Sequence, residues 1–415
     1  MLKNLQIEFP IFNLQKNMLK RALTKKLKEA AKQYPVVTLT GPRQSGKTTL
    51  VKMAFPDYEY LSLEEPDHRA FAIEDPRGFL SQFSEKVILD EIQRAPDLFS
   101  YIQTLVDTKD ISGQFILTGS QNFLLLQKVS QSLAGRCAVL HLLPFSLSEL
   151  NQRRPLPIDS IGRQLPGKNR SLNEELSSVL FKGFYPRIHD KSLEPIDWLG
   201  NYFQTYIERD VRDVLNVGDL ETFSRFVRLC AGRSGQLLNL SSLANDCGIT
   251  HTTSKRWISI LETSFIVFLL RPHYKNFSKR LIKSPKLYFL DTGLLSYLLR
   301  IRSQEDLQFH ALYGNIFESY VISEFLKTYM NSGKEHSIYF WRDSTGNEID
   351  ILVDEGDTLT PVEIKAGQTV ASDFFKGIRF WKKLTADMDQ GAALIYGGDK
   401  SYIRSNTYVY PWSVF

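Results

Sequence analysis

The sequence predicts an α/β protein in three parts: a parallel sheet near the start, a mainly helical middle, and a second α/β unit at the end. The first part rests on short apolar runs that alternate with helical patterns over residues 35–150, as in parallel strands joined by helices. The prediction of the last part rests on a helical pattern over residues 316–329, which is followed by three short strand patterns. The 415 residues are enough for about two to four domains.

The chain is divided where these patterns change. Residues 151–175 contain three prolines and two glycines, which favour a linker or a surface excursion. The predicted strands are 36–40, 58–63, 86–90, 114–119 and 138–143 in the first unit, and 338–342, 348–353 and 359–364 in the last. The predicted segments are a basic N-terminal arm (1–34), a sheet unit with its linker (35–175), a helical unit (176–300) and a C-terminal α/β unit (301–415).

Composition argues against several classes of protein. No apolar run approaches the ~20 residues that span a bilayer, and the N-terminus lacks an apolar signal segment. The three cysteines are widely spaced and odd in number, which argues against a disulfide framework or a zinc site and favours the cytoplasm. The net charge of +5 is uneven, because residues 1–34 alone carry +6. Such clustering reflects either a solvated face or contact with an anionic polymer.

Residues 41–48, GPRQSGKT, match the phosphate-binding pattern G-x-x-x-x-G-K-[ST] between a strand and a helix. Glycines let successive backbone N–H groups turn toward phosphate oxygens, and the following helix directs its partial positive charge at the same anion. Lys47 is expected to neutralise the β and γ phosphates, and the Thr48 hydroxyl to ligate Mg²⁺. We therefore predict ATP and Mg²⁺ as cofactors, with the nucleotide bound by Gly41, Pro42, Arg43, Gln44, Ser45, Gly46, Lys47, Thr48 and Thr49.

The strand 86–90 ends in Asp90 and is followed by Glu91. An aspartate at the carboxyl end of a buried strand can hold Mg²⁺ and its waters, and an adjacent glutamate can polarise the attacking water. The alternative is that Asp90 caps the next helix and Glu91 is merely exposed. Because strand 58–63 and its helix lie between the two motifs, we expect a strand to separate the loop strand from the Asp90 strand. ATPases have this arrangement, whereas small nucleotide kinases do not.

Two further positions are candidates for the hydrolysis site. A polar side chain after the strand 114–119, either Asn122 or Ser120, could position the lytic water. Arg136 could meet the γ-phosphate of a neighbouring subunit as an arginine finger, which implies a homo-oligomer. A surface arginine paired with an acidic residue is the alternative for Arg136.

The chain resembles a family of bacterial and archaeal AAA-type P-loop ATPases. The resemblance is carried by five segments in this order: GPRQSGKTT, VILDEIQ, ILTGSQN, LAGR and LPFSLSEL. Members of this family carry a C-terminal domain of unknown function, which is matched by YIERDV at 206–211 and LYFLDTGL at 287–294. The resemblance covers nearly the whole chain. It implies an ATPase core of the AAA (ASCE) type, a helical and winged-helix middle, and an end similar to restriction-endonuclease-like folds.

Residues 240–261 have helix-turn-helix spacing. An apolar helix face precedes Gly248, and a second helix with a Thr- and Ser-rich start carries Lys255 and Arg256. A block without acidic residues follows as the expected wing, with Arg271, Lys275, Lys279, Arg280, Lys283 and Lys286. Because phosphates require clustered Lys and Arg, we predict DNA as the partner of this region. Protein–protein modules use the same fold, so an adaptor role stays open.

The C-terminal unit carries Asp350 on one predicted strand and Glu363 and Lys365 on the next. A strand Glu-x-Lys points both charged side chains to one face. Asp350 could complete a carboxylate pair for Mg²⁺, with Lys365 near the scissile phosphate or the attacking water. This set resembles the Asp…Glu-x-Lys core of metal-dependent nucleases, and the family resemblance adds Glu318 as an upstream metal ligand. The alternative is a degenerate nuclease fold kept as a structural or DNA-holding platform.

The sequence therefore predicts a cytoplasmic ATPase that binds and processes DNA, with ATP turnover gating a metal-dependent nuclease-like end. One alternative is a nucleotide-dependent regulatory switch that recruits a protein partner. A second is a protein remodeller with a degenerate nuclease fold. An intact set of Asp350, Glu363 and Lys365 favours the first hypothesis.

Overall fold

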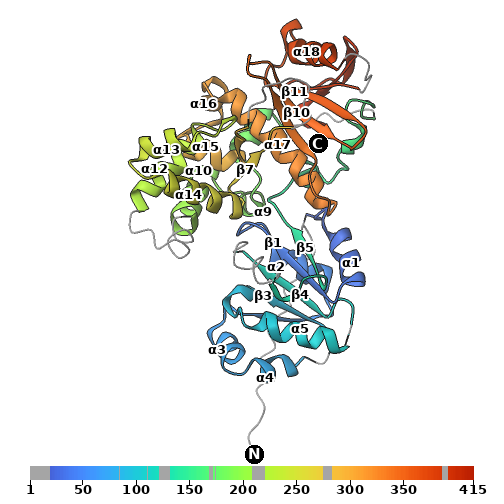
Figure 1. Cartoon of the computed structure of the whole chain (residues 1–415), viewed down its shortest axis with the longest axis vertical. Coiled ribbons are helices and arrows are strands. Elements are labelled where there is room, and N and C mark those ends of the chain that lie inside the picture. Colours follow the sequence, from blue (N-terminus) through green and yellow to red (C-terminus); the bar gives the residue numbers. More distant parts are fainter. Residues whose placement is uncertain are drawn as a thin grey trace, which may run out of the picture.

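The computed structural model describes residues 19–83, 85–109, 111–120, 131–167, 172, 174–207, 220–273, 283–385 and 391–415. The molecule is elongated, with the first sheet unit at one end and a helical unit beside a second sheet unit at the other (Figure 1). Within the described residues, no helix is long and apolar enough to cross a membrane.

The first sheet has five strands, all parallel, in the order β2-β3-β4-β1-β5. The five predicted strands are confirmed as β1 (Val36–Thr40), β2 (Glu59–Ser62), β3 (Val87–Asp90), β4 (Phe115–Gly119) and β5 (Cys137–His141). A strand does separate β1 from the Asp90 strand β3, as predicted. That strand is β4, whereas β2, which lies between the two motifs in the sequence, forms an edge of the sheet.

Helices cover both faces of this sheet. They are α1 (Thr24–Gln33), α2 (Lys47–Ala54), α3 (Pro66–Glu74), α4 (Pro76–Ser81) and α5 (Leu98–Lys109). Because successive strand residues point to opposite faces, Val36 packs with α4 and α5 whereas Val37 packs with α1 and α2. Part of the predicted basic arm is therefore the packed helix α1, and residues 1–18 lie outside the described residues.

The middle unit is mainly helical, as predicted. Its helices are α8 (Leu176–Lys182), α9 (Pro186–Lys191), α10 (Pro195–Tyr202), α12 (Leu220–Ala231), α13 (Leu240–Cys247), α14 (His251–Thr263), α15 (Thr292–Leu298) and α16 (Gln304–Phe309). Between α13 and α14, Gly248 adopts a left-handed conformation with φ 69°, and the Thr250 hydroxyl accepts the N–H of Thr253. These two features end one helix and begin the next, which gives the predicted helix-turn-helix.

A small antiparallel sheet completes the middle unit. Its order is β6-β8-β7, with β6 (Gln236–Leu237), β7 (Val267–Leu270) and β8 (Lys286–Phe289). The hairpin β7–β8 follows α14 directly in the sequence. The residues that join the two strands include 274–282, which lie outside the described residues.

The C-terminal unit is a mixed sheet of six strands in the order β13-β14-β12-β11-β10-β9. Its elements are α17 (Tyr313–Asn331), β9 (Ile338–Arg342), β10 (Glu348–Asp354), β11 (Leu359–Lys365), α18 (Lys376–Leu384), β12 (Ala393–Tyr396), β13 (Tyr402–Arg404) and β14 (Thr407–Pro411). Val362 and Ile364 of β11 pack in the core that contains α17, whereas Leu359 packs with Trp381 of α18. The sheet therefore has a helix on each face.

The segment predicted as a linker or surface excursion packs against the C-terminal unit. It follows α7 (Leu147–Leu150) and includes the short helix η2 (Ile158–Ser160). The N–H of Leu156 donates to the carbonyl of Val414 at 3.3 Å, and the N–H of Gly162 donates to the Tyr410 hydroxyl at 2.9 Å. The chain thus passes over the last sheet before it enters the middle unit.

Candidate functional site

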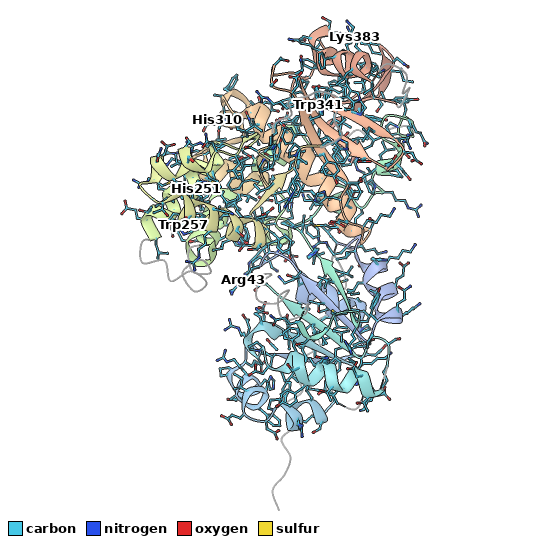
Figure 2. The ribbon with its side chains drawn as sticks, viewed as in Figure 1. Arg43, His251, Trp257, His310, Trp341 and Lys383 are labelled. Atoms are coloured by element: carbon cyan, nitrogen blue, oxygen red, sulfur yellow. The ribbon has the colours of Figure 1, made fainter. Side chains whose placement is uncertain are left out.

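The phosphate-binding loop joins β1 to α2. A Cβ at Gly41 would lie 2.1 Å from the carbonyl oxygen of Leu142, so only glycine fits there. The Lys47 ammonium is buried and donates to the carbonyls of Gly41 at 3.0 Å and Pro42 at 2.9 Å. Arg43 of the loop lies at the end of this unit that faces the rest of the chain (Figure 2). Lys47 is thus held directly over the loop that precedes it.

Asp90 meets Thr48 across the carboxyl edge of the sheet. The Thr48 hydroxyl donates to Asp90 Oδ2 at 2.9 Å, as does the Tyr60 hydroxyl at 2.8 Å. Thr118 donates to the other carboxylate oxygen. Burial, and then Asp90 itself, raises the pKa of Tyr60. None of these contacts is a helix N–H, so Asp90 acts here as the centre of a hydroxyl cluster and not as a helix cap.

Glu91 follows in the left-handed conformation, with φ 56°. Its Oε2 accepts from the Ser120 hydroxyl at 3.1 Å and from the Gln93 amide. Of the two candidates for positioning water, Ser120 therefore contacts Glu91, and Asn122 lies outside the described residues. Sequence reasoning missed Gln93, and also Tyr60 and Thr118 beside Asp90. Their common signal is a polar residue on a strand that ends at this edge, or within three residues after such a strand.

Arg136 precedes β5 and pairs with Asp107 of α5, with NH2 and Oδ2 3.0 Å apart. Both side chains are partly exposed. Within the chain, Arg136 thus has the acidic partner that the surface-arginine alternative requires.

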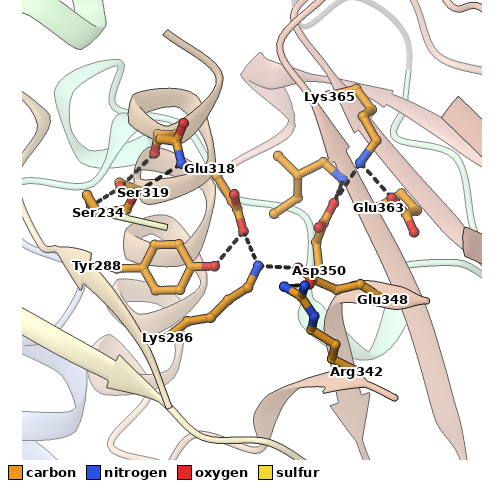
Figure 3. Close-up of polar contacts among 12 residues, drawn as sticks. Ser234, Lys286, Tyr288, Glu318, Ser319, Arg342, Glu348, Asp350, Glu363 and Lys365 are labelled. Atoms are coloured by element: carbon orange, nitrogen blue, oxygen red, sulfur yellow. Dashed lines mark hydrogen bonds and ion pairs between the residues drawn. The ribbon is translucent and has the colours of Figure 1, made fainter. Parts of the chain in front are cut away.

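In the C-terminal unit, Asp350, Glu363 and Lys365 come together from β10 and β11 (Figure 3). Lys365 Nζ donates to Asp350 Oδ2 at 2.9 Å and to Glu363 Oε2 at 2.6 Å. The contact between Glu363 and Lys365 agrees with the predicted common face of a Glu-x-Lys strand. The lysine therefore lies between the two carboxylates.

A β-bulge aims Asp350 at this cluster. The pairing of β10 with β9 shifts register between Ile349 and Leu352, and the Asp350 carboxylate takes the N–H of Ile364 on β11 at 2.8 Å. Bulges commonly redirect a side chain in this way. No simple sequence pattern signals the bulge.

The pKa values of the two carboxyl groups are shifted in opposite directions. Burial, and then the neighbouring Asp350, raises the pKa of Glu363 well above its usual range. Burial also acts to raise the pKa of Asp350, but the ammonium groups of Lys365 and Lys286 outweigh it and hold that pKa below its usual value. Asp350 is therefore the ionised partner of Lys365. Glu363 is packed so closely that a Cβ at Gly377 of α18 would lie 1.9 Å from its Oε1.

Glu318 does not join Asp350 and Glu363 as predicted. It projects from α17 toward Lys286, and its Oε1 accepts from Lys286 at 3.1 Å and from the Tyr288 hydroxyl. Lys286 also pairs with Glu348 of β10. Across the part of the chain that the structure describes, no three His, Cys, Asp or Glu residues lie close enough to hold one metal ion. The proposed ligand set of three carboxylates is therefore not formed here.

The predicted DNA-binding residues divide into exposed and buried ones. Lys286 is only 3 % exposed, because β8 turns it into the contact with Glu318, so its assignment to a basic wing is wrong. Arg271 and Lys283 are exposed, whereas Lys275, Lys279 and Arg280 lie outside the described residues. On α14 the exposed face carries His251, Thr252, Lys255, Arg256 and Ser259.

Family models match three stretches of the chain. The one described as "AAA domain" matches residues 33–151, which contain the phosphate-binding loop, Asp90 and Glu91. The chain carries an AAA-type P-loop ATPase domain. The match to this domain supports ATP binding and hydrolysis. The other two are described as domains of unknown function, DUF8612 over residues 173–305 and DUF4143 over residues 313–415. The predicted AAA-type ATPase domain and C-terminal domain of unknown function are confirmed to this extent, but the segments 206–211 and 287–294, which the prediction assigned to that C-terminal domain, lie in the DUF8612 match.

Curated relatives include an uncharacterized protein of Mycobacterium bovis and one of Mycobacterium tuberculosis. Each is 28% identical over 394 residues, which cover 94% of this chain and 82% of the relative. Among solved structures, the Walker-type ATPase of Pyrococcus abyssi matches with a TM-score of 0.43 and 14% identity, over 67% of this chain and 95% of that one.

Proposed function

We propose that Lys47, Thr48, Asp90 and Glu91 carry out the ATP hydrolysis of the AAA domain. The Thr48 hydroxyl and the Asp90 carboxylate, 2.9 Å apart, are the oxygen ligands that Mg²⁺ prefers. When bound, Mg²⁺ neutralises charge on the phosphates. Lys47 adds a second positive charge at the β and γ oxygens, and Glu91, oriented by Ser120 and Gln93, accepts the proton of the attacking water.

We further propose that the middle unit binds DNA as a winged helix. The order α12, β6, α13, α14, β7, β8 supports this assignment, because the helix-turn-helix is followed by a hairpin. One face of α14 is buried, with Trp257, Ile258 and Leu261. The opposite face carries Lys255 and Arg256 and is available to a groove of DNA. Phosphate contacts by such residues make binding depend steeply on salt.

Changing Lys255 and Arg256 together to alanine tests this surface. We expect weaker binding to duplex DNA and a salt slope that is shallower by about 0.9 for each phosphate that the variant no longer neutralises. A matched double variant, Lys334→Ala with Lys400→Ala, removes two exposed lysines elsewhere and should bind like the wild type. An unchanged slope in the α14 variant would assign DNA binding to another surface, with residues 1–34 as the next candidate.

For the C-terminal unit we propose metal-dependent DNA cleavage in a restriction-endonuclease-like fold. The observation that carries this proposal is the convergence of Asp350, Glu363 and Lys365 on adjacent strands. Two carboxylates with water fit Mg²⁺, which is often held by one or two acidic side chains. When bound, a divalent cation acts as a Lewis acid on the phosphate. Asp350 and Glu363 would hold it, and Lys365 would stabilise charge that develops on the phosphate oxygens.

The test is incubation of the full chain with single-stranded, duplex and branched DNA, with Mg²⁺ or Mn²⁺, and with and without ATP. We expect cleavage that is lost in Asp350→Asn and in Lys365→Ala, and kept in Asp373→Asn, which changes an exposed aspartate near α18. The Lys255 and Arg256 double variant should still cleave at reduced affinity.

A DNA-holding platform is the second candidate, and one observation favours it. Lys365 already lies between both carboxylates, and Lys286 already pairs with Glu318 and Glu348. A site whose charges are balanced internally has less need of a metal ion. DNA binding without cleavage of any substrate, with either metal, would support this second function and contradict the first.

A further inference from the structure

A buried arginine lies behind the phosphate-binding loop. Arg21 precedes α1, and its side chain is 8% exposed. Its NH1 donates to the carbonyl of Ser45 in the loop at 2.7 Å, and its NH2 to the carbonyl of Leu143 at 2.6 Å. Its Nε donates to Glu149 Oε1 at 3.0 Å. Because all three guanidinium nitrogens have partners, a movement of the loop at Ser45 either breaks its contact with Arg21 or shifts the other two contacts.

Glu149 connects this arginine to the first turn of α7. Its Oε1 also accepts the N–H of Ala22 at 2.7 Å, and its Oε2 accepts the N–H of Ser146 at 2.9 Å. The Ser146 hydroxyl accepts the N–H of Glu149 in return, at 3.2 Å. This reciprocal pair fixes the start of the helix and the position of the carboxylate together. It also explains part of the motif LPFSLSEL, which the proposed function does not use.

The same turn is held from the other side by the C-terminal unit. Glu324 of α17 is completely buried, and its Oε2 accepts the N–H of Leu147 at 3.0 Å. Its Oε1 pairs with Lys327 at 2.9 Å, and the Lys327 ammonium lies 3.7 Å from the centre of the Phe184 ring. Burial raises the pKa of Glu324, while Lys327 and the Leu147 N–H act against that rise. A buried carboxyl group with this many partners is costly to disturb.

We propose that Arg21 is a positioning residue of the phosphate-binding loop, and that the contacts Ser45–Arg21–Glu149 and Leu147–Glu324, joined by the first turn of α7, couple the loop to α17. When nucleotide binding moves the loop, the shift at Ser45 passes through Arg21 and Glu149 to the first turn of α7, and from there to Glu324. Because binding free energies are linked reciprocally, a change at Glu324 alters nucleotide affinity in turn. The helix that receives this signal also carries Glu318, the partner of Lys286. The proposal requires ATP binding by the AAA domain and does not depend on DNA cleavage.

Titration calorimetry with ADP and Mg²⁺ on the full chain tests the coupling. We expect Arg21→Gln to weaken ADP binding about 10-fold, the effect of losing a buried charge-assisted hydrogen bond. Glu324→Gln should weaken it several-fold although Glu324 is remote from the loop. The double variant should weaken binding by less than the product of the two single effects, because residues in one network are not additive. Arg77→Gln and Glu335→Gln, at exposed positions, are the matched controls.

The coupling would be overturned if Glu324→Gln bound ADP as tightly as the wild type, or if the loss of affinity in the double variant equalled the product of the two single losses. Unchanged ADP affinity in Arg21→Gln would overturn the positioning role. Hydrogen exchange supplies a measurement that does not depend on how the Glu324 variant folds. In the wild type, ADP should slow exchange of the backbone amides of α17, and Arg21→Gln should remove most of that effect. If ADP leaves the exchange rates of the α17 amides unchanged in the wild type, the coupling is equally rejected.

Discussion

The phosphate-binding loop and the C-terminal cluster are both built around a lysine, but the two lysines find their partners differently. Lys47 contacts Gly41 and Pro42, which belong to its own eight-residue motif. Lys365 contacts Glu363 on its own strand and also Asp350, which a bulge on another strand brings into reach. A site that lies within one motif can be recognised from spacing alone, whereas a site assembled from several segments depends on the tertiary fold.

The charges around the two lysines differ as well. The hydrogen bonds described for Lys47 end on backbone carbonyls, which carry no net charge. Lys365 faces two carboxylic groups, and a metal ion at that cluster would compete with it. The loop is therefore suited to a nucleotide as it stands, while the cluster must rearrange its ion pairs to take a cation.

The largest effect is expected from Lys47→Ala. ATP hydrolysis should be lost and nucleotide binding weakened, because the β and γ phosphates lose their counter-ion. Phosphate release and nucleotide titration measure the two effects. Lys109→Ala, at an exposed position on α5, should behave like the wild type. Hydrolysis at the wild-type rate by Lys47→Ala would mean that another site holds the nucleotide.

Glu91→Gln should keep ATP bound and slow turnover by about 10²–10⁴-fold, the usual contribution of a general base. The amide keeps the shape of the side chain but accepts no proton from water. Single-turnover hydrolysis and ATP binding are measured side by side, with Glu59→Gln as the exposed control. Equal rates for wild type and Glu91→Gln would remove Glu91 from the catalytic role.

Arg136→Ala should slow hydrolysis by up to ~10³-fold if Arg136 reaches a neighbouring subunit, with nucleotide affinity kept. Mixing this variant with Lys47→Ala should then restore some activity, because each subunit supplies what the other lacks. Asp107→Ala removes the partner of Arg136 within the chain and should not slow hydrolysis. An absence of rescue in a preparation that forms oligomers would leave Arg136 as a surface ion pair.

Lys365→Ala should lower the free energy of unfolding by about 2 kcal/mol. A fully buried ion pair costs ~3–5 kcal/mol when one partner is removed, and Lys365 is 33% exposed, so solvent reduces the effect. Mn²⁺ should recover part of the loss by taking the place of the ammonium group. Urea unfolding with and without Mn²⁺ gives both quantities. An absence of any stabilisation by Mn²⁺ in the variant would indicate that the carboxylates do not bind a metal ion.

The smallest effect concerns pH. Because the pKa of Glu363 is raised above the usual 4.5, the folded chain keeps a proton that the unfolded chain releases. This contribution to stability is complete below pH 4.5 and is lost as the pH rises through the raised pKa. Glu363→Gln mimics the protonated group, so as the pH rises above 4.5 the variant should lose less stability than the wild type. Parallel pH profiles would contradict this assignment.

The elements were predictable from the sequence wherever a local pattern specifies them. The strand that ends at Asp90, the loop around Lys47 and the left-handed Gly248 between two helices all follow from periodicity and from residue types that few other conformations accept. Lys286 was misassigned because five basic neighbours in the sequence resemble a wing, and its burial against Glu318 depends on where α17 packs. The contact between Arg21 and Ser45 likewise has no local signal, because tertiary packing brings the two segments together.

The crossing of residues 156–164 over the last sheet has a consequence for how the protein is made. Hydrogen bonds join Leu156 to Val414 and Gly162 to Tyr410, so this segment has its partners near the far end of the chain. The AAA domain can complete its sheet as soon as β5 has left the ribosome, since domains generally fold as units during synthesis. The C-terminal sheet gains its cover from residues 156–164 only after the middle unit has also been synthesised. Contacts of such long sequence separation slow folding, so we expect refolding in two phases, with the ATPase unit first.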